Sequence, residues 1–228
     1  MIKYFDNFPS LKKEYFDKLE IYFNLLVEYN EKFNLTSIVS KEEVYIKHFV
    51  DSLKITELLN FNDFKTFLDI GTGAGLPGVV IAIFFPNLKV TLIESNSKKC
   101  LFLEIISKKL ELNNVIIINK RAEEFIKENR NSYDIVTARA VGSLPLLLEI
   151  AVPFVKLSHY YIAMRGKTYE DDLKEAENAI KELKIKLVNT KTFDLPENSG
   201  SRANMLFIKN KNIDKYPREY KLILNKHL

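Results

Sequence analysis

The chain has 228 residues, of which 46% are hydrophobic and 28% charged, enough for one substantial core but too few for two full catalytic domains. Its net charge of +4, from 34 basic and 30 acidic residues, is too mild to identify a nucleic-acid partner. One cysteine, three scattered histidines, no membrane-length apolar run and no signal-peptide pattern predict a cytoplasmic protein without disulfides, a membrane span or a metal site.

Residues 1–62 are predicted to form a helical cap. Ser10 can cap a helix whose apolar side chains recur every three or four residues as far as Phe33. Ser40, with a glutamate three residues later, forms a capping box before a second helical pattern that ends at Leu59. We therefore expect two helices in this region.

From residue 63 onward, short β-branched or aliphatic runs alternate with helical patterns, which is typical of a parallel sheet. The predicted strands cover residues 66–70, 88–94, 115–119, 133–138 and 160–164. The predicted helices cover residues 76–85, 97–112, 123–129, 143–155 and 169–183. Two more strand-like runs, 185–195 and 203–209, are close enough for an antiparallel hairpin.

The predicted fold is therefore α/β, a doubly wound, mostly parallel, seven-stranded sheet with an antiparallel C-terminal hairpin. The N-terminal helical extension covers 1–62, the sheet domain 63–210, and a basic C-terminal tail 211–228.

The most informative segment is residues 67–78, with the sequence FLDIGTGAGLPG. Its glycines follow a predicted strand directly, and glycine lets the backbone turn tightly and approach a bound cofactor. The pattern Gly73-x-Gly75-x-x-Gly78, with Glu94 21 residues after Gly73, formally fits a dinucleotide site. An ordinary strand-to-helix turn is the alternative without a ligand.

Two carboxylates distinguish the cofactors. The pyrophosphate of a dinucleotide is stabilised by a helix N-terminus, whereas S-adenosylmethionine carries cationic groups that favour nearby carboxylates. Asp69 lies two residues before Gly71, and Glu94 ends the second predicted strand, where it can accept hydrogen bonds from ribose hydroxyls. The loop resembles that of class I, Rossmann-like methyltransferases dependent on S-adenosylmethionine. The expected cofactor-binding residues are Asp69, Gly71, Thr72, Gly73, Gly75, Leu76, Glu94, Ala122, Glu123 and Arg139.

Several methyl acceptors are disfavoured by the sequence. Enzymes that methylate exocyclic amines typically carry Asn/Asp-Pro-Pro-aromatic after the fourth strand, where this chain has ARAVG at 138–142. Cytosine carbon-5 methylation needs a thiolate, but Cys100 lies within a predicted helix and is expected in the core. Catechol-type transfer needs metal ligands, and no convincing group of them is present. Guanine N7 needs neither base nor metal, and Arg139 is expected to contact the substrate.

Motifs along most of the chain closely resemble one family, the bacterial 16S rRNA guanine-N7 methyltransferase G, also called glucose-inhibited division protein B. The similar segments are NLTS at 34–37, KHFVDSL at 47–53, DIGTGAGLPG at 69–78, ARA at 138–140 and GSR at 200–202. The chain departs from the family at Arg165, where lysine is more usual, and at 219–223, which lacks the usual glycine and proline. The resemblance implies methylation of the guanine at nucleotide 527 of 16S rRNA, with the rRNA or the small ribosomal subunit as partner.

The remaining expectations concern the substrate face. His48 is expected at the catalytic site in a positioning role with Asp51 or Ser52, since an N7 acceptor has no proton to remove. Basic residues from strand-end loops and the terminal hairpin, except any paired with acids, are predicted to bind RNA. These residues are Lys120, Arg121, Arg165, Lys167 and Arg202, together with Arg139. A monomer is expected. A small-molecule methyltransferase and a non-catalytic RNA-binding protein remain the alternatives.

Overall fold

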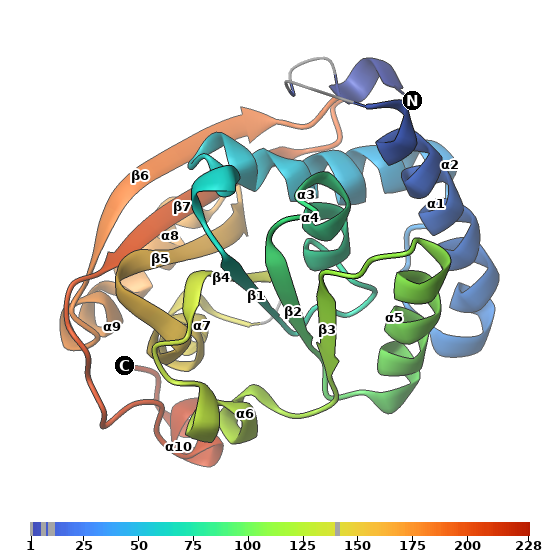
Figure 1. Ribbon diagram of the computed structural model, residues 1–228. Coiled ribbons are helices and arrows are strands. Elements are labelled where there is room, and N and C mark those ends of the chain that lie inside the picture. Colours follow the sequence, from blue (N-terminus) through green and yellow to red (C-terminus); the bar gives the residue numbers. More distant parts are fainter. Residues whose placement is uncertain (1, 6–7, 9–11, 140–141) are drawn as a thin grey trace.

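The computed structural model describes residues 2–5, 8, 12–139 and 142–228. Seven strands within these residues form one sheet in the order β3-β2-β1-β4-β5-β7-β6 (Figure 1). They are β1 (Thr66–Ile70), β2 (Lys89–Ile93), β3 (Val115–Ile118), β4 (Tyr133–Arg139), β5 (Val155–Gly166), β6 (Ile185–Asp194) and β7 (Ser201–Lys209). Strands β1 to β5 pair in parallel, while β7 pairs antiparallel with β5 and β6. The predicted sheet with its C-terminal hairpin is confirmed.

Helices cover both faces of this sheet. They are α1 (Lys13–Phe33), α2 (Lys41–Val44), α3 (Asp51–Leu53), α4 (Gly78–Phe84), α5 (Ser97–Lys109), α6 (Ala122–Asn129), α7 (Leu144–Ala151), α8 (Tyr169–Glu175), α9 (Glu177–Glu182) and α10 (Tyr220–Asn225). A π-helical segment, Tyr45–Val50, connects α2 to α3, and a 3-10 turn, Lys54–Glu57, follows α3. Among the described residues, no helix combines the length and the apolar character needed to cross a membrane.

Two hydrophobic cores lie on opposite faces of the sheet because alternate residues of each strand point in opposite directions. Phe67 of β1 packs into the core formed with α1, α4 and α5, and the adjacent Leu68 packs into the core formed with α6, α7, α9 and α10. Burial on both faces explains why most residues of the central strands are apolar.

Several helices differ from the predicted ones. The second helical stretch is continuous but widens into a π-helix at Tyr45–Val50. Helix α7 ends at Ala151 and the chain continues as a 3-10 turn, Val152–Phe154, because Pro153 has no backbone N–H with which to continue the α-helical hydrogen bonds. The long helix predicted after β5 is broken at Ala176 into α8 and α9. Ser40 caps α2 as predicted, whereas the predicted Ser10 cap and the residues at 11 and 140 lie outside the described residues.

The basic C-terminal segment packs against the domain. Arg218 donates to both carboxylate oxygens of the fully buried Glu149 on α7, at 2.8 and 2.6 Å. Tyr216 and Ile223 are also buried. These contacts place the start of α10 beside the carboxyl ends of the central strands.

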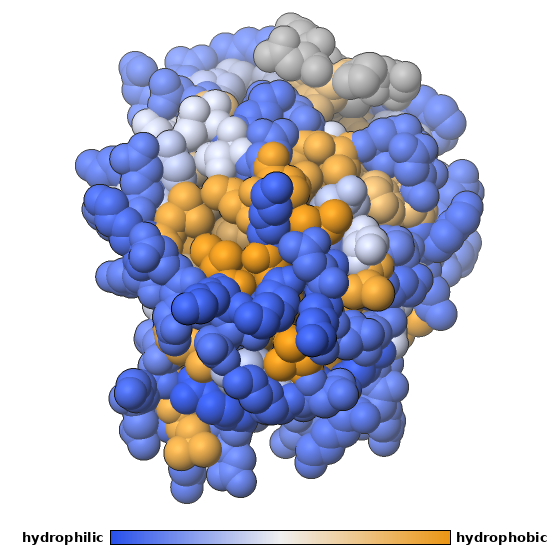
Figure 2. All heavy atoms as spheres, turned by 90° about the vertical axis from the view of Figure 1, so that its left-hand side faces the viewer, coloured by the Kyte–Doolittle hydropathy of each residue, from blue (hydrophilic) through white to orange (hydrophobic). Residues whose placement is uncertain are grey.

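The side of the molecule that carries β6 has apolar surface between hydrophilic side chains (Figure 2). Leu157 of β5 and Val188 of β6 are exposed to 48% and 45%. β6 is an edge strand, and its exposed Lys186 and Lys191 are the kind of charged side chain that disfavours pairing with another chain.

Candidate active site

The sheet has a topological switch between β1 and β4. The helix after β1, α4, packs into one core, and the helix after β4, α7, packs into the other. Open parallel sheets bind ligands in the crevice at the carboxyl ends of strands at such a point. The glycine loop and Arg139 meet there.

The glycine loop needs its glycines for two reasons. Gly71, Gly73 and Gly75 have φ values of 66°, 60° and 100°, a region that side chains disfavour. Gly78 has no room for a side chain, because a Cβ there would lie 2.2 Å from the Leu92 Cδ2 atom. The fully buried Tyr22 of α1 donates its hydroxyl to the Ala74 carbonyl at 2.7 Å, so the helical extension holds the loop.

Asp69 lies beneath the loop, fully buried. Its Oδ2 atom accepts hydrogen bonds from the Thr72 hydroxyl at 2.6 Å and from the Gly78 amide at 2.9 Å, while its buried Oδ1 atom has no hydrogen-bond partner among the described residues. Burial raises the pKa of Asp69 to about 6, although the two hydrogen bonds oppose the shift. The carboxylate therefore fixes the conformation of the loop.

Glu94 directly follows β2 and contacts the glycine loop. Its two carboxylate oxygens accept from the Gly73 amide at 3.0 Å and the Asn96 amide at 2.8 Å. Cys100 is buried as predicted, and its thiol donates to the Glu94 carbonyl at 3.2 Å. These three hydrogen bonds hold Glu94 at the border of two cavities.

Three adjoining cavities form one groove along the strand ends. The first, of about 210 Å³, contains the predicted Ala122 and Glu123 and is joined to the second through Gly71 and Glu94. The second, of about 380 Å³, lies over the glycine loop. The third, of about 400 Å³, shares His48 and Arg139 with the second. We call them the base, central and acceptor cavities, after the nucleobase of the cofactor and the methyl acceptor that are expected from the sequence beside their residues.

The C-terminal segment forms part of the wall of the base cavity. Tyr220 of α10 lines it, and the Arg121 guanidinium lies 4.4 Å from the Tyr220 ring centroid. Arg121 also donates to Glu123 at 3.3 Å. The charge of Arg121 is therefore paired at this end of the groove. Lys120 lines the same cavity, and both residues are separate from the other predicted RNA-binding residues.

The acceptor cavity is organised by a buried carboxylate. The Oδ2 atom of Asp51 lies 3.4 Å from the Arg139 Nη1 atom, and its Oδ1 atom lies 3.5 Å from the Arg202 Nε atom. Arg139 also donates to the Lys47 carbonyl at 3.3 Å. Burial raises the pKa of Asp51, and both guanidinium groups oppose that shift. A single carboxylate thus holds one arginine of β4 and one arginine of β7 in the lining of the acceptor cavity.

His48 lies where the central and acceptor cavities meet. Its Nε2 atom lies 3.0 Å from the Thr36 hydroxyl and its Nδ1 atom 3.1 Å from the Lys47 carbonyl, which assigns the proton to Nδ1. Of the two residues expected to act with His48, Asp51 lines the acceptor cavity with it, and the Ser52 hydroxyl donates to the His48 carbonyl rather than to the ring. Burial, assisted by Arg139, lowers the pKa of His48 to about 4, so the ring is neutral at pH 7.

The other predicted RNA-binding residues lie at the same end. Arg165 lines the acceptor cavity but is held by Asp172 through two hydrogen bonds of 2.8 and 3.0 Å. Arg202 lines that cavity and a neighbouring one that also contains Lys167. By the exclusion of acid-paired residues, Arg165 and Arg121 are weaker candidates than Lys167 and Lys120. Arg139 and Arg202 share the single carboxylate of Asp51, so one positive charge of these two arginines is not compensated by Asp51.

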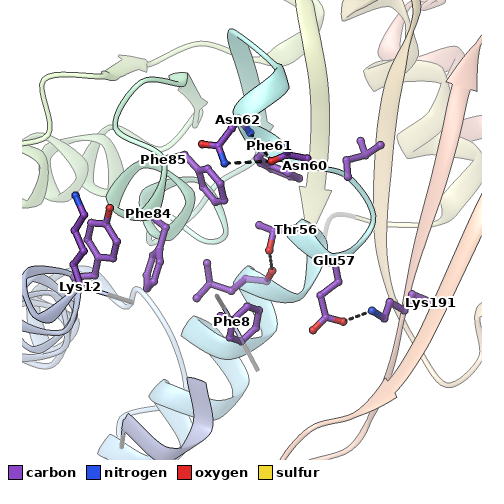
Figure 3. A pocket seen from close by; sticks show the side chains of 13 residues that line it. Phe8, Lys12, Thr56, Glu57, Asn60, Phe61, Asn62, Phe84, Phe85 and Lys191 are labelled. Carbon is purple, nitrogen blue, oxygen red and sulfur yellow. Dashed lines mark hydrogen bonds and ion pairs between the residues drawn. The ribbon is translucent and has the colours of Figure 1, made fainter. Parts of the chain in front are cut away.

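A larger cavity, of about 600 Å³, lies away from this groove (Figure 3). Phe84 and Phe85, at the end of α4, line it with Phe61 and the ion pair of Lys191 and Glu57. Because α4 begins at the glycine loop and runs antiparallel to β1, this cavity belongs to the amino-terminal edge of the strands. It has none of the groove residues.

Sequence reasoning missed two residues that line the groove, Lys99 and Tyr220, and one that supports it from beneath, Tyr22. Tyr22 was an apolar position in a helical pattern, and its buried hydroxyl gave no signal. Lys99 lines the central cavity from the first turn of α5, and Tyr220 reaches the base cavity from the C-terminal segment. Only the tertiary fold brings them to the groove.

Comparison with known proteins identifies the family. The model of the family described as GidB, rRNA small subunit methyltransferase G, matches residues 15–200. The chain belongs to this family. It is 43% identical over 211 residues to a ribosomal RNA small subunit methyltransferase G of Acholeplasma laidlawii (strain PG-8A), covering 92% of this chain and 91% of that relative. The methyltransferase G of Bacillus subtilis (strain 168) is 43% identical over 213 residues, covering 92% and 89%. The resemblance seen in the motifs is confirmed.

Solved structures agree on the fold of this methyltransferase G family member. An O-methyltransferase from Bacillus cereus in complex with SAH superposes with a TM-score of 0.63 at 14% identity, covering 92% of this chain and 96% of that chain. TYW2 from M. jannaschii in complex with AdoMet gives 0.55 at 18% identity, covering 70% and 74%. The predicted class I, Rossmann-like methyltransferase fold is confirmed.

Proposed function

We propose that the chain transfers a methyl group from S-adenosylmethionine to N7 of a guanine in 16S rRNA, the guanine at nucleotide 527. The family supports rRNA methylation. The observation that carries the proposal is the continuous groove, which has the carboxylate-flanked glycine loop at one end and the Asp51–Arg139–Arg202 cluster at the other.

The base and central cavities fit S-adenosylmethionine. Ala122 and Glu123 would hold the adenine, Glu94 the ribose hydroxyls, and residues 71–74 the methionine portion. Gly73 leaves open space in this cradle, since the nearest atom to a Cβ at that position would be 4.0 Å away. The cofactor supplies a methyl group on a cationic sulfonium, and the carboxylates of Glu94 and Asp69 favour that charge.

The acceptor cavity fits an acceptor that loses no proton. Guanine N7 attacks with an in-plane lone pair, so the chain need only orient the base in line with the methyl group and exclude water. His48 is suited to this role rather than to that of a base, because both ring nitrogens have partners within the chain and its pKa is lowered to about 4. Arg139 lines both cavities and can contact the base or its phosphate.

The test is transfer of labelled methyl to 16S rRNA and to immature small subunits. Methylation at guanine N7 makes the RNA cleavable by borohydride and aniline at one nucleotide, and we expect a single cleavage that maps to nucleotide 527. Labelling of adenine or cytosine would contradict the N7 assignment. Transfer only to small metabolites would contradict the RNA substrate.

A further inference from the structure

A further cavity, of about 300 Å³, adjoins the acceptor cavity at Arg202, which lines both. The residues that line it are Lys167, Tyr169, Thr192, Phe193, Asp194, Ser201 and Arg202. Across the sheet, Arg202 pairs with Gly166 of β5 on one side and with Phe193 of β6 on the other. The cavity therefore lies at the same edge of the sheet as the groove, one strand further out.

The lining combines aromatic rings with cations. Tyr169 and Phe193 are half-buried, Tyr169 at the start of α8 and Phe193 at the end of β6, and they pack against different hydrophobic cores. Lys167 is exposed, and Asp194 accepts a hydrogen bond from the Ser201 hydroxyl at 2.7 Å. Aromatic side chains beside cations match a nucleotide, because the base stacks on a ring and the phosphate pairs with a cation.

Access to N7 supplies the reason for a second nucleotide. The major groove of an RNA helix is too deep and narrow for side chains, so a guanine whose N7 is methylated must lie in a single-stranded or opened segment. Its neighbour in the chain then loses a stacking partner on one face. Arg202 stands between the two cavities, paired with Asp51 on the acceptor side, where the phosphate that joins two consecutive nucleotides would pass.

We propose that this cavity, which we call the flanking cavity, binds the unstacked nucleotide next to the methylated guanine. This inference rests on the proposed function and names a further part of its substrate. Tyr169 and Phe193 stack on the base, while Lys167 and Arg202 hold its phosphates.

The experiment measures binding and transfer separately at one fixed salt concentration. A fluorescent RNA hairpin with the target guanine is compared with two hairpins that lack the base immediately before or after it. Tyr169→Ala is compared with Tyr169→Phe, which keeps the ring. Phe193→Ala is a second but less specific test, because it also removes the contact between the Phe193 ring and the Lys54 ammonium, which lies 5.4 Å from the ring centroid. Calorimetry with S-adenosylmethionine checks that the cofactor end is intact.

For the wild type, we expect removal of one neighbouring base to weaken hairpin binding about tenfold. Tyr169→Ala should weaken binding of the intact hairpin by a similar factor. It should not further weaken binding of the hairpin whose missing base weakens wild-type binding, and Tyr169→Phe should bind as the wild type does. The proposal is overturned if both alanine variants bind the intact hairpin as tightly as the wild type does. It is also overturned if a variant loses the same factor on the intact and the abasic hairpins. If the wild type binds with this pattern but transfers no methyl group, the proposed function fails while the flanking cavity stands.

Discussion

At the cofactor end of the groove, most polar contacts join residues close in sequence: Asp69 holds Thr72 and Gly78, three and nine residues later. At the acceptor end, Asp51 holds Arg139 and Arg202, which are 88 and 151 residues away in the chain. The first end depends on a local backbone conformation and the second on the whole fold. Substitutions at the two ends should therefore separate cofactor binding from methyl transfer.

The largest effect is expected at the glycine loop. Gly73→Asp places a carboxylate beside Glu94, which accepts from the Gly73 amide, at a backbone φ of 60°. Like-charge repulsion and backbone strain should weaken S-adenosylmethionine binding about 100-fold or more, as measured by calorimetry. Gly73→Asn has the same shape without the charge and should bind more tightly than Gly73→Asp. Equal affinities for the two variants would remove the electrostatic explanation.

The next effect concerns the acceptor end alone. Arg139→Ala should leave the dissociation constant for S-adenosylmethionine within a few-fold but lower the rate of methyl transfer to RNA about 100-fold, because the substrate loses an orienting contact. Arg139→Lys keeps the charge without the planar fork and should recover only part of the rate. A variant with full transfer activity would exclude Arg139 from the site.

Asp51 should act through the two arginines. Asp51→Asn keeps the side-chain shape but removes the charge that holds both guanidinium groups. We expect kcat/KM for RNA to fall about tenfold with unchanged cofactor affinity. The loss should appear mainly in KM and its salt dependence, which a purely structural role would not change. A fall in melting temperature with normal kinetic constants would argue for a structural role only.

The smallest effect is a change in acid stability at the junction of the two ends. Because the folded state lowers the pKa of His48 from 6.5 to about 4, the unfolded chain binds the proton more readily and stability is lost as the pH falls through this window. Between pH 7 and 5 this loss is about 2 kcal/mol. Asp69 opposes it, since its raised pKa favours the folded state on acidification, but Asp69 is unchanged in a variant of His48.

His48→Gln should therefore reduce the difference in urea-unfolding free energy between pH 7 and pH 5. Thr36→Val, which removes the hydroxyl partner of His48 without removing the titrating ring, is the matched control and should keep most of that difference. An unchanged difference in His48→Gln would mean that His48 is not the group responsible.

Three features can be recognised from the order of residues: the alternation of strands and helices, the glycine loop with Asp69 and Glu94, and the membership in the methyltransferase G family. Periodicity and glycine spacing are local properties, because strand direction and turn geometry depend on neighbouring residues. Three contacts are visible only in the folded chain: Asp51 joins Arg139 to Arg202, Thr36 holds His48, and Tyr220 lines the base cavity. These contacts depend on how the helical extension and C-terminal segment dock on the sheet, and docking is determined by burial over both faces rather than by any local pattern.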